Sequence, residues 1–371
     1  MKKSIRRFTL SLHLVCSLVF GLFIIAVCAT GSILVFDDEI EQALNPNYFT
    51  PASSEINVDV KEAEHIFHEK YEGFQISRMD VPSKKLDIYH ASLSKGDHEV
   101  DAYLDPSNGK LLGNLNKDET FVSFVKELHT HLLLDDIGEV IIGIVAIAFI
   151  IIIISGAYLW YPGIKKMFKS LKIKWNKGQM ARNFSLHNFI GVITLPFLLV
   201  VAGTGMLFPF QEKIEETLKL KLTSNYPEEL KSVDNGKQQV GLDKIASEIK
   251  NLHPEGELYK FRLPSDKTGV IEVQLNDGTY DPKGKGNTSE FFDQFSGKHL
   301  GTFSKSTETT YDKFFVWRES LHRGTFGGLF TKIIYALVGI APLGLGITGV
   351  TMWAIKRKNK TIKLQKLQKS A

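Results

Sequence analysis

The sequence contains little cysteine, with two such residues in 371 positions. Both, Cys16 and Cys28, lie in one apolar run near the N-terminus, where a helix would hold them about 18 Å apart. Because that distance is too long for a disulfide bond, the two cysteines cannot pair with each other. The sequence also lacks the Cys-x-x-Cys-His pattern that attaches haem covalently.

Familiar catalytic motifs are missing as well. The chain has no nucleophile elbow, phosphate-binding loop, dinucleotide fingerprint or zinc-protease motif. No residue can therefore be named as catalytic from the sequence.

What the sequence does have is four long apolar runs, although its mean hydropathy is close to zero. Each run is long enough to cross the hydrocarbon layer of a membrane, which takes about 20 helical residues. They cover residues 8–36, 137–161, 189–210 and 326–355.

Three segments carry many lysines and arginines but no acidic residue: the N-terminus, residues 163–182 and the tail after residue 355. With four spans these segments lie on one side, which the positive-inside rule makes the cytoplasm. The formal net charge of +4 therefore gives no indication of nucleic-acid binding, because the basic excess belongs to the membrane surface.

Spacing indicates that the chain is a tandem duplication. His13 precedes Thr30-Gly31 by the same interval as His187 precedes Thr204-Gly205. The interval from His129 to Gly156 likewise equals that from His322 to Gly349. Both copies have the same orientation, as in parallel-repeat membrane proteins.

The predicted fold is a four-helix transmembrane bundle with two α+β modules outside the cytoplasm, arranged as a tandem parallel repeat. In the first module we expect a helix at 59–70 and strands near 74–80, 86–92 and 99–104. In the second we expect a helix at 242–251 and strands near 258–263, 269–275 and 290–293. The predicted divisions are 1–36 (first span), 37–120 (first module), 121–162 (second span), 163–182 (basic cytoplasmic link), 183–210 (third span), 211–316 (second module), 317–355 (fourth span) and 356–371 (basic cytoplasmic tail).

The repeat places histidines in pairs at two depths. His13 and His187 would lie near the cytoplasmic face, and His129 and His322 near the external face. Two imidazoles facing each other from different helices are what a six-coordinate b-type haem requires, so we expect an inner and an outer haem, two in all. The alternatives are histidines that only pack helices together, or a non-haem transition metal, for which few further ligands are at hand.

Three nearby residues add to the outer site. His131 is an alternative ligand to His129, although the repeat favours His129. Arg318 and Arg323 flank His322, where they could neutralise haem propionates, hold an anionic substrate, or anchor the helix at the interface.

These motifs resemble the PepSY-associated transmembrane family of bacterial membrane proteins, and the resemblance covers nearly the whole chain. It is carried by Leu-His followed by Thr-Gly or Ser-Gly in each span, and by the Asp-Pro-x-x-Gly-Lys-x-x-Gly ending at 105–113. The second copy departs from that ending, with Gln294 in place of proline. The resemblance implies PepSY modules and haem b, and some members reduce ferric siderophores.

We therefore expect a di-haem b oxidoreductase of the bacterial inner membrane that passes electrons to a ferric siderophore or another ferric chelate. Its partners would be the lipid bilayer and a separate electron donor, since the cytoplasmic segments are too short for a flavin or nicotinamide domain. The alternative is a membrane-anchored PepSY regulator that binds a peptidase or envelope partner and has no redox activity. A transporter is disfavoured, because Glu139 is the one acidic residue in the apolar runs that could couple ions.

Overall fold

The computed structural model describes residues 2–83, 86–96, 98–218, 230–234, 236, 238–277, 288–304 and 310–370. The chain divides into two compact units. The membrane unit comprises Met1–Phe36, Val125–Leu220 and Leu321–Ala371, and the sheet unit comprises Asp37–Phe124 and Lys221–Ser320. Parts of the predicted second module, at 219–229, 278–287 and 305–309, lie outside the described residues.

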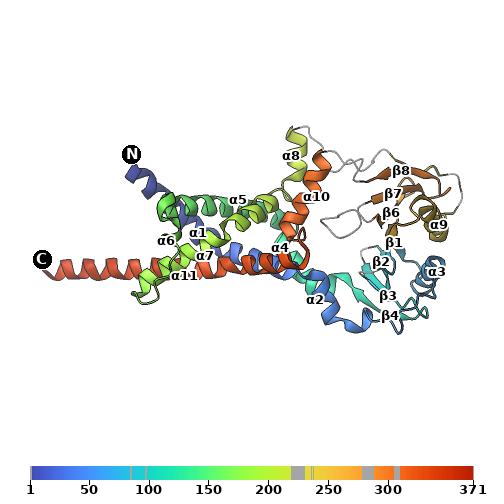
Figure 1. Ribbon diagram of the computed structural model, residues 1–371, viewed down its shortest axis with the longest axis horizontal. Helices are drawn as coiled ribbons and strands as arrows, with labels where there is room; N and C mark the ends of the chain where they lie inside the picture. Colours follow the sequence, from blue (N-terminus) through green and yellow to red (C-terminus); the bar gives the residue numbers. More distant parts are fainter. Residues whose placement is uncertain are drawn as a thin grey trace. The chain divides into compact units, whose positions relative to one another are not determined.

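Four helices of the membrane unit are long and apolar enough to cross a bilayer, in agreement with the predicted spans. They run side by side in Figure 1. Each packs against two of the others, in the cyclic order α1, α5, α7, α11. Their bounds are Lys2–Leu34 (α1), Asp135–Trp160 (α5), Gln179–Met206 (α7) and Gly328–Ser370 (α11). The last of them continues through the predicted basic tail.

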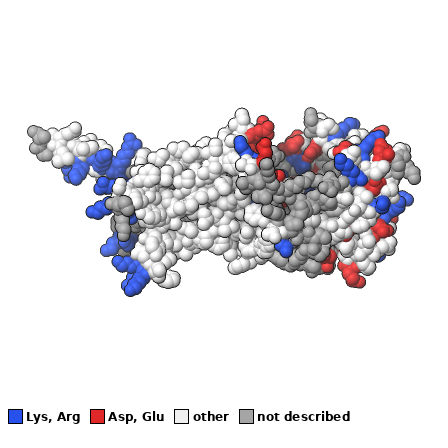
Figure 2. Space-filling view, turned by 90° about the horizontal axis from the view of Figure 1, so that it is seen from above, with Lys and Arg blue, Asp and Glu red and all other residues white. Residues whose placement is uncertain are grey.

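Apolar side chains occupy both the inside and the outside of this bundle. The inside is a cluster of buried residues that includes Phe149, Leu198 and Val338. On the outside, Leu22 and Ile137 are among the many large apolar side chains that remain exposed. Figure 2 shows the uncharged surface of this unit, with lysines and arginines at one end. A surface of this kind is suited to lipid, since water would oppose its exposure.

The segments that precede the second and fourth spans are separate helices. The predicted span at 121–162 divides into α4 (Phe121–His131) and α5, and α10 (Thr310–Arg323) precedes α11. The break after α4 has positive φ at Leu132, Leu133 and Asp135, and the break after α10 has positive φ at Gly324 and Gly328. Left-handed backbone cannot continue a right-handed helix, so the chain changes direction at both places.

The sheet unit is built on one eight-stranded antiparallel sheet in the order β4-β3-β2-β1-β5-β6-β7-β8. The predicted first and second modules contribute β1–β4 and β5–β8, respectively, and β1 pairs with β5 at the centre. The predicted two modules therefore share one continuous sheet. The strands are Gln75–Asp80 (β1), Tyr89–Lys95 (β2), His98–Leu104 (β3), Leu111–Asn116 (β4), Glu257–Arg262 (β5), Val270–Asn276 (β6), Thr288–Asp293 (β7) and His299–Phe303 (β8).

Two helices, α3 (Val60–Lys70) and α9 (Leu242–Leu252), contact each other and cover one face of this sheet. A single buried cluster contains Phe67 of α3, Ile245 of α9 and Phe261 of β5. The core therefore includes residues of both copies. The remaining elements are short: α2 (Asp37–Leu44), η1 (Pro46–Tyr48), η2 (Lys117–Glu119), η3 (Ile164–Lys166), α6 (Met167–Ser170) and α8 (Gln211–Leu218).

The strands β4 and β8 were not predicted from the sequence, and they follow equivalent turns. In both turns an aspartate carboxylate accepts backbone hydrogen bonds, at 2.8 Å from Ser107 to Asp105 and at 2.7 Å from Ser296 to Asp293. The substitution of Gln294 for proline leaves this turn intact. The backbone N–H of Gln294 donates a hydrogen bond to the hydroxyl of Ser232 at 2.9 Å, and a proline at this position could not do so.

Candidate functional site

The four predicted histidines lie in equivalent positions within the membrane unit. Each imidazole packs against a Ser-Gly or Thr-Gly pair of another helix. We call these four positions the histidine seats. In these seats His13 packs against Ser155-Gly156, His187 against Thr348-Gly349, His129 against Thr30-Gly31, and His322 against Thr204-Gly205.

In the first two seats the partners are residues near the end of α5 and in the middle of α11. Nδ1 of His13 lies 2.9 Å from the hydroxyl of Ser155 and 3.1 Å from the carbonyl oxygen of Ile152. Nδ1 of His187 lies 2.9 Å from the hydroxyl of Thr348.

In the other two seats the partners lie near the ends of α1 and α7. Nδ1 of His129 lies 2.9 Å from the carbonyl oxygen of Val27 and 3.1 Å from the hydroxyl of Thr30. Nδ1 of His322 lies 3.1 Å from the carbonyl oxygen of Val201 and 3.2 Å from the hydroxyl of Thr204. The same nitrogen of each ring therefore faces a hydroxyl in all four seats.

The hydroxyl groups show which way these hydrogen bonds run. Each has a backbone carbonyl of its own helix to donate to: Thr30 donates to Ala26 at 2.9 Å, and Thr348 to Gly344 at 2.8 Å. A hydroxyl has one proton, so its lone pairs are left to accept from the imidazole, as the carbonyl oxygens do. This network assigns the proton of each ring to Nδ1 and the lone pair to Nε2. A histidine that binds a metal through Nε2 has this tautomer.

Glycine follows the hydroxyl residue because the imidazole lies against the backbone there. A Cβ added to Gly205 would be 2.8 Å from Cε1 of His322, and one at Gly31 would be 3.0 Å from Cε1 of His129. The corresponding distances are 3.2 Å at Gly156 and 3.6 Å at Gly349. A side chain at Gly205 would therefore clash with the ring, one at Gly31 or Gly156 would need the ring to move by a few tenths of an ångström, and one at Gly349 would make an ordinary contact.

His13 and His187, the α1/α7 pair, line one cavity of about 540 Å³. Its walls are mostly apolar and include Trp160 and Trp353, while Arg6 and Lys356 add positive charge to the lining. A volume of this size is in the range of cofactor sites. From the sequence, Arg6 and Lys356 indicate only membrane topology, because their position on the cavity depends on how the helices pack.

His129 and His322, the α4/α10 pair, face each other directly. Their ring centroids are 6.2 Å apart and the rings are tilted by 53°. Phe208 packs edge-on against His322 at 5.3 Å. An imidazole bound to a metal through Nε2 has its centroid about 3 Å from that metal, so 6.2 Å is compatible with two axial ligands on one ion.

The other predicted residues lie around this pair. Nδ1 of His131 is 3.2 Å from the carboxylate of Glu127 and 2.8 Å from the hydroxyl of Thr130, both on its own helix α4. His129, rather than His131, therefore has its ring against His322. Arg318 and Arg323 flank His322 on α10 and are half-buried. Their role as propionate partners stays a prediction.

The donor set of each pair suits haem better than a bare metal ion. Among the described residues, no three His, Cys, Asp or Glu side chains gather closely enough to hold a metal ion. A structural zinc site uses four protein ligands, whereas haem supplies four nitrogens itself and needs two axial ligands. Two imidazoles with Nε2 lone pairs and close-packed glycines fit that requirement.

The two pairs are well separated along the bundle. Helix α1 contributes His13 to one pair, and its Thr30 contacts His129 of the other pair. On a helix, the distance along the axis from His13 to Thr30 is about 25 Å. The bundle thus carries one histidine pair toward each end.

Comparison with known proteins identifies the family of the chain. No curated protein sequence matches it significantly. The family described as the PepSY-associated TM region matches residues 10–356, which include all four seated histidines and both halves of the sheet. With four helices suited to span a bilayer, the chain is a multi-pass membrane protein and belongs to the PepSY-associated TM family.

Proposed function

We propose that this protein is a di-haem b oxidoreductase that carries electrons across the bacterial inner membrane to a ferric siderophore or another ferric chelate. The observation that supports it most is the repeated histidine seat. Four imidazoles are held by the same hydrogen bonds from Nδ1, in two pairs near opposite ends of the bundle. Packing histidines would not need the same tautomer four times.

In this proposal Nε2 of each of the four histidines would bind the haem iron, and the hydroxyls and carbonyls of the seats hold the rings in place. Haem would supply a one-electron carrier at each pair. The walls of the α1/α7 cavity are mostly apolar, and Arg6 and Lys356 there are suited to bind the propionate carboxylates. At the α4/α10 pair, Arg318 and Arg323 would serve the same purpose.

The charge distribution supports an orientation with both termini in the cytoplasm. The acid-free basic segments precede α1, link α5 to α7, and end α11. The α1/α7 pair would then be the inner haem site, nearer the cytoplasmic electron donor. The α4/α10 pair would be the outer site, nearer the ferric chelate, whose iron gains one electron and becomes ferrous.

Haem content is the direct test. The protein is purified in detergent after expression with added haem, and haem b is measured by the pyridine haemochrome spectrum. We expect two haems per chain. His13→Ala and His187→Ala should each lose the same haem, and His129→Ala and His322→Ala should each lose the other, so that one haem remains in every single variant.

His131→Ala is the matched control, because this ring contacts Glu127 and Thr130 of its own helix. It should keep both haems. A folded wild-type protein without haem b would contradict the proposal and favour the regulator, in which the histidines only pack helices.

Electron transfer is tested on the reduced protein. When it is mixed with a ferric chelate, the chelate should oxidise the haems, and the His322→Ala variant should be reoxidised far more slowly.

A further inference from the structure

Helix α11 continues well past the apolar part of the bundle. Its apolar span ends at Ile355, but the helix runs on to Ser370. We call residues 356–370 the α11 extension. In Figure 1 the extension reaches beyond the other helices of the membrane unit, at the end marked C. Residues 356–368 are all exposed, so none of the described segments of the chain covers them.

The extension is strongly basic, and this end of the membrane unit offers it no acidic side chain. It contains seven lysines and arginines and no aspartate or glutamate. The segments that approach it from the other spans, within 1–36 and 140–211, contain no acidic residue either. On the face drawn in Figure 2, this end of the unit shows lysines and arginines alone. A surface with this charge attracts a negatively charged partner.

One face of the extension is continuous with the wall of the α1/α7 cavity. That wall includes Trp353 and Lys356 of α11. Residues four and seven positions apart share a face of a helix, so Lys360 and Lys363 follow Lys356 on the cavity side. We call these three residues the lysine stripe. Lys358, two positions after Lys356, is about 200° round the helix and faces the other way.

Lipid headgroups can reach only the first part of the extension. Trp353 marks the membrane interface, where tryptophans gather, and Arg357 lies over its ring at 5.3 Å. The headgroup layer is about 5–8 Å thick, and the potential of anionic lipid falls off within about 8 Å more. On a helix, Lys363 lies about 10 Å past Lys356, and Lys366 lies about 15 Å past it. The outer part of the extension is therefore in water.

A second copy of this chain does not suit the extension as a partner. It has the same acid-free segments at this end, so it offers no carboxylate side chains to the lysines. A soluble acidic protein does offer them. Because the lysine stripe begins at the cavity lined by His13 and His187, a protein bound along it lies next to that histidine pair.

We propose that the lysine stripe of the α11 extension docks a small acidic redox protein that releases one electron at a time. This inference rests on the proposed function, in which the α1/α7 pair is the inner site. Carboxylates of the partner pair with Lys360 and Lys363. One electron leaves the reduced group of the partner and converts the ferric haem iron at His13 and His187 to ferrous iron. No bond is formed or broken, and no proton is transferred.

An acidic [2Fe–2S] ferredoxin carrying a fluorescent label is the probe. Its binding to the full-length protein is measured by fluorescence anisotropy, in nanodiscs of neutral phosphatidylcholine. Wild type should bind the ferredoxin, and the affinity should fall as salt is added. Lys360→Glu replaces an attraction by a repulsion and should lower the affinity about tenfold, and so should Lys363→Glu.

Lys358→Glu is the matched control. It changes the charge by the same amount at nearly the same height on α11, but on the face turned away from the cavity. It should lower the affinity by less than about threefold, because the salt screens charges on the far side of the helix. All these residues are exposed, so the substitutions leave the packing of the bundle unchanged.

Electron delivery is the second measurement. With reduced ferredoxin as the donor, stopped-flow absorbance should show haem reduction about tenfold slower in Lys360→Glu than in Lys358→Glu. Dithionite, which needs no docking surface, should reduce the haems of both variants at the same rate.

The inference is overturned if wild type does not bind the ferredoxin, or if Lys358→Glu and Lys360→Glu lose affinity equally. It is also overturned if anionic phosphatidylglycerol in the nanodisc abolishes binding, since lipid then covers the stripe. A wild-type dimer that Lys360→Glu dissociates, seen by light scattering, would assign the stripe to a second copy instead. A haem-containing protein that does not bind ferredoxin refutes this surface and leaves the proposed function standing. Ferredoxin binding by a protein that holds no haem would contradict the proposed function alone.

Discussion

Nδ1 of His187 on α7 lies 2.9 Å from the hydroxyl of Thr348 on α11, although 161 residues separate the two in the chain. The hydroxyl donates its own proton to the carbonyl oxygen of Gly344 at 2.8 Å, so it accepts from the imidazole. This contact holds the proton on Nδ1. The tautomer of His187 is thus set by a residue of another helix, and the same relationship recurs in the other three seats.

If the protein binds haem as proposed, replacing the hydroxyl should weaken the binding of the haem iron by His187. Thr348→Val keeps the shape of the side chain but removes the acceptor for Nδ1–H. Loss of such supporting contacts typically lowers metal affinity about 10–100-fold, so we expect the variant to lose the haem of the α1/α7 pair on dilution. Thr348→Ser restores the hydroxyl and should retain haem.

A second measurement of the same contact does not need haem. Nitrogen-15 NMR of labelled histidine in the haem-free protein reports which ring nitrogen of His187 carries the proton. The Thr348→Val spectrum should show a larger share of the Nε2–H tautomer than wild type. An unchanged tautomer would argue against the positioning role of Thr348.

Replacing a seat glycine by alanine should have a larger effect where the imidazole lies closer to the glycine. A Cβ at Gly205 would lie 2.8 Å from Cε1 of His322, but one at Gly349 would lie 3.6 Å from Cε1 of His187. The first is a clash and the second is an ordinary contact, so Gly205→Ala should displace His322 and, in the proposed di-haem protein, reduce haem toward one per chain. Gly349→Ala, in the equivalent motif, should keep both haems. Equal haem content in the two variants would contradict this difference.

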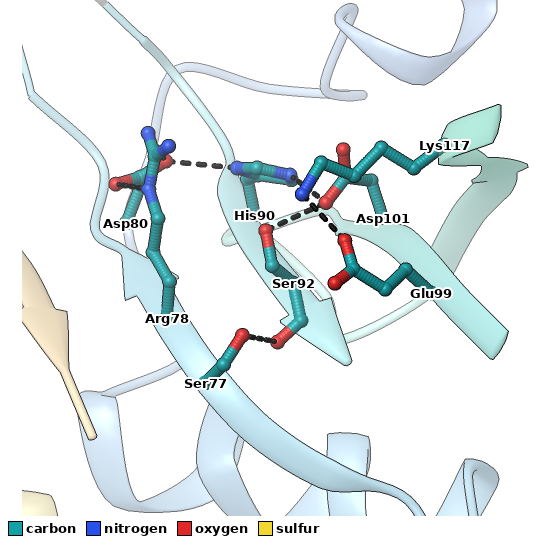
Figure 3. Close-up of polar contacts among 8 residues, drawn as sticks. All are labelled: Ser77, Arg78, Asp80, His90, Ser92, Glu99, Asp101 and Lys117. Carbon is teal, nitrogen blue, oxygen red and sulfur yellow. Dashed lines mark hydrogen bonds and ion pairs between the residues drawn. The ribbon is translucent and has the colours of Figure 1, made fainter. Parts of the chain in front are cut away.

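The stability of the sheet should depend on pH through His90. Contacts with Asp101 and Asp80, drawn in Figure 3, outweigh burial and raise the pKa of His90 to about 9. A raised pKa means that the stabilisation is fully present below the ordinary value of 6.5 and is lost as pH rises through about 9. The difference corresponds to about 3 kcal/mol. The pKa of Asp80 is lowered by the same contacts despite its burial, so its contribution is lost as pH falls through the acidic range.

Hydrogen exchange of the β2 and β3 amides, corrected for the intrinsic rates, measures this effect between pH 6 and 10. Protection should fall with rising pH in wild type. His90→Asn should be less protected at pH 6 and should show a smaller fall. If the variant and wild type lose protection in parallel, His90 is not the group responsible.

The pairing of β1 with β5 should make the two copies unfold together. Phe261 is fully buried at this seam, so Phe261→Ala should lower the free energy of unfolding of the sheet unit by about 3–5 kcal/mol. Protection against hydrogen exchange should fall in β2 and β3 as well as in β6 and β7. Leu252→Ala, at an exposed position on α9, is the control and should have little effect. Loss of protection confined to β5–β8 would mean that the copies are independent.

The sequence by itself determined the spans and the family, and its spacing predicted a repeat. Membrane helices satisfy their backbone within a single segment, so length and apolarity are sufficient to find them. The first-copy helix at Val60–Lys70 and the strand at His98–Leu104 were also predictable, because their apolar periodicity is local. The strands Leu111–Asn116 and His299–Phe303 were not, since their ladders depend on turns whose aspartates bond to distant backbone.

Only the tertiary structure decided which groups meet. Thr30 and His129 are 99 residues apart, and nothing in local propensity predicts their contact. The position of the His129 ring, rather than that of His131, against His322 likewise depends on which side of α4 packs against α1 and α10. The pairing of β1 with β5 joins strands of the two predicted modules, which spacing cannot reveal. In each case the deciding energy comes from packing between segments far apart in the chain.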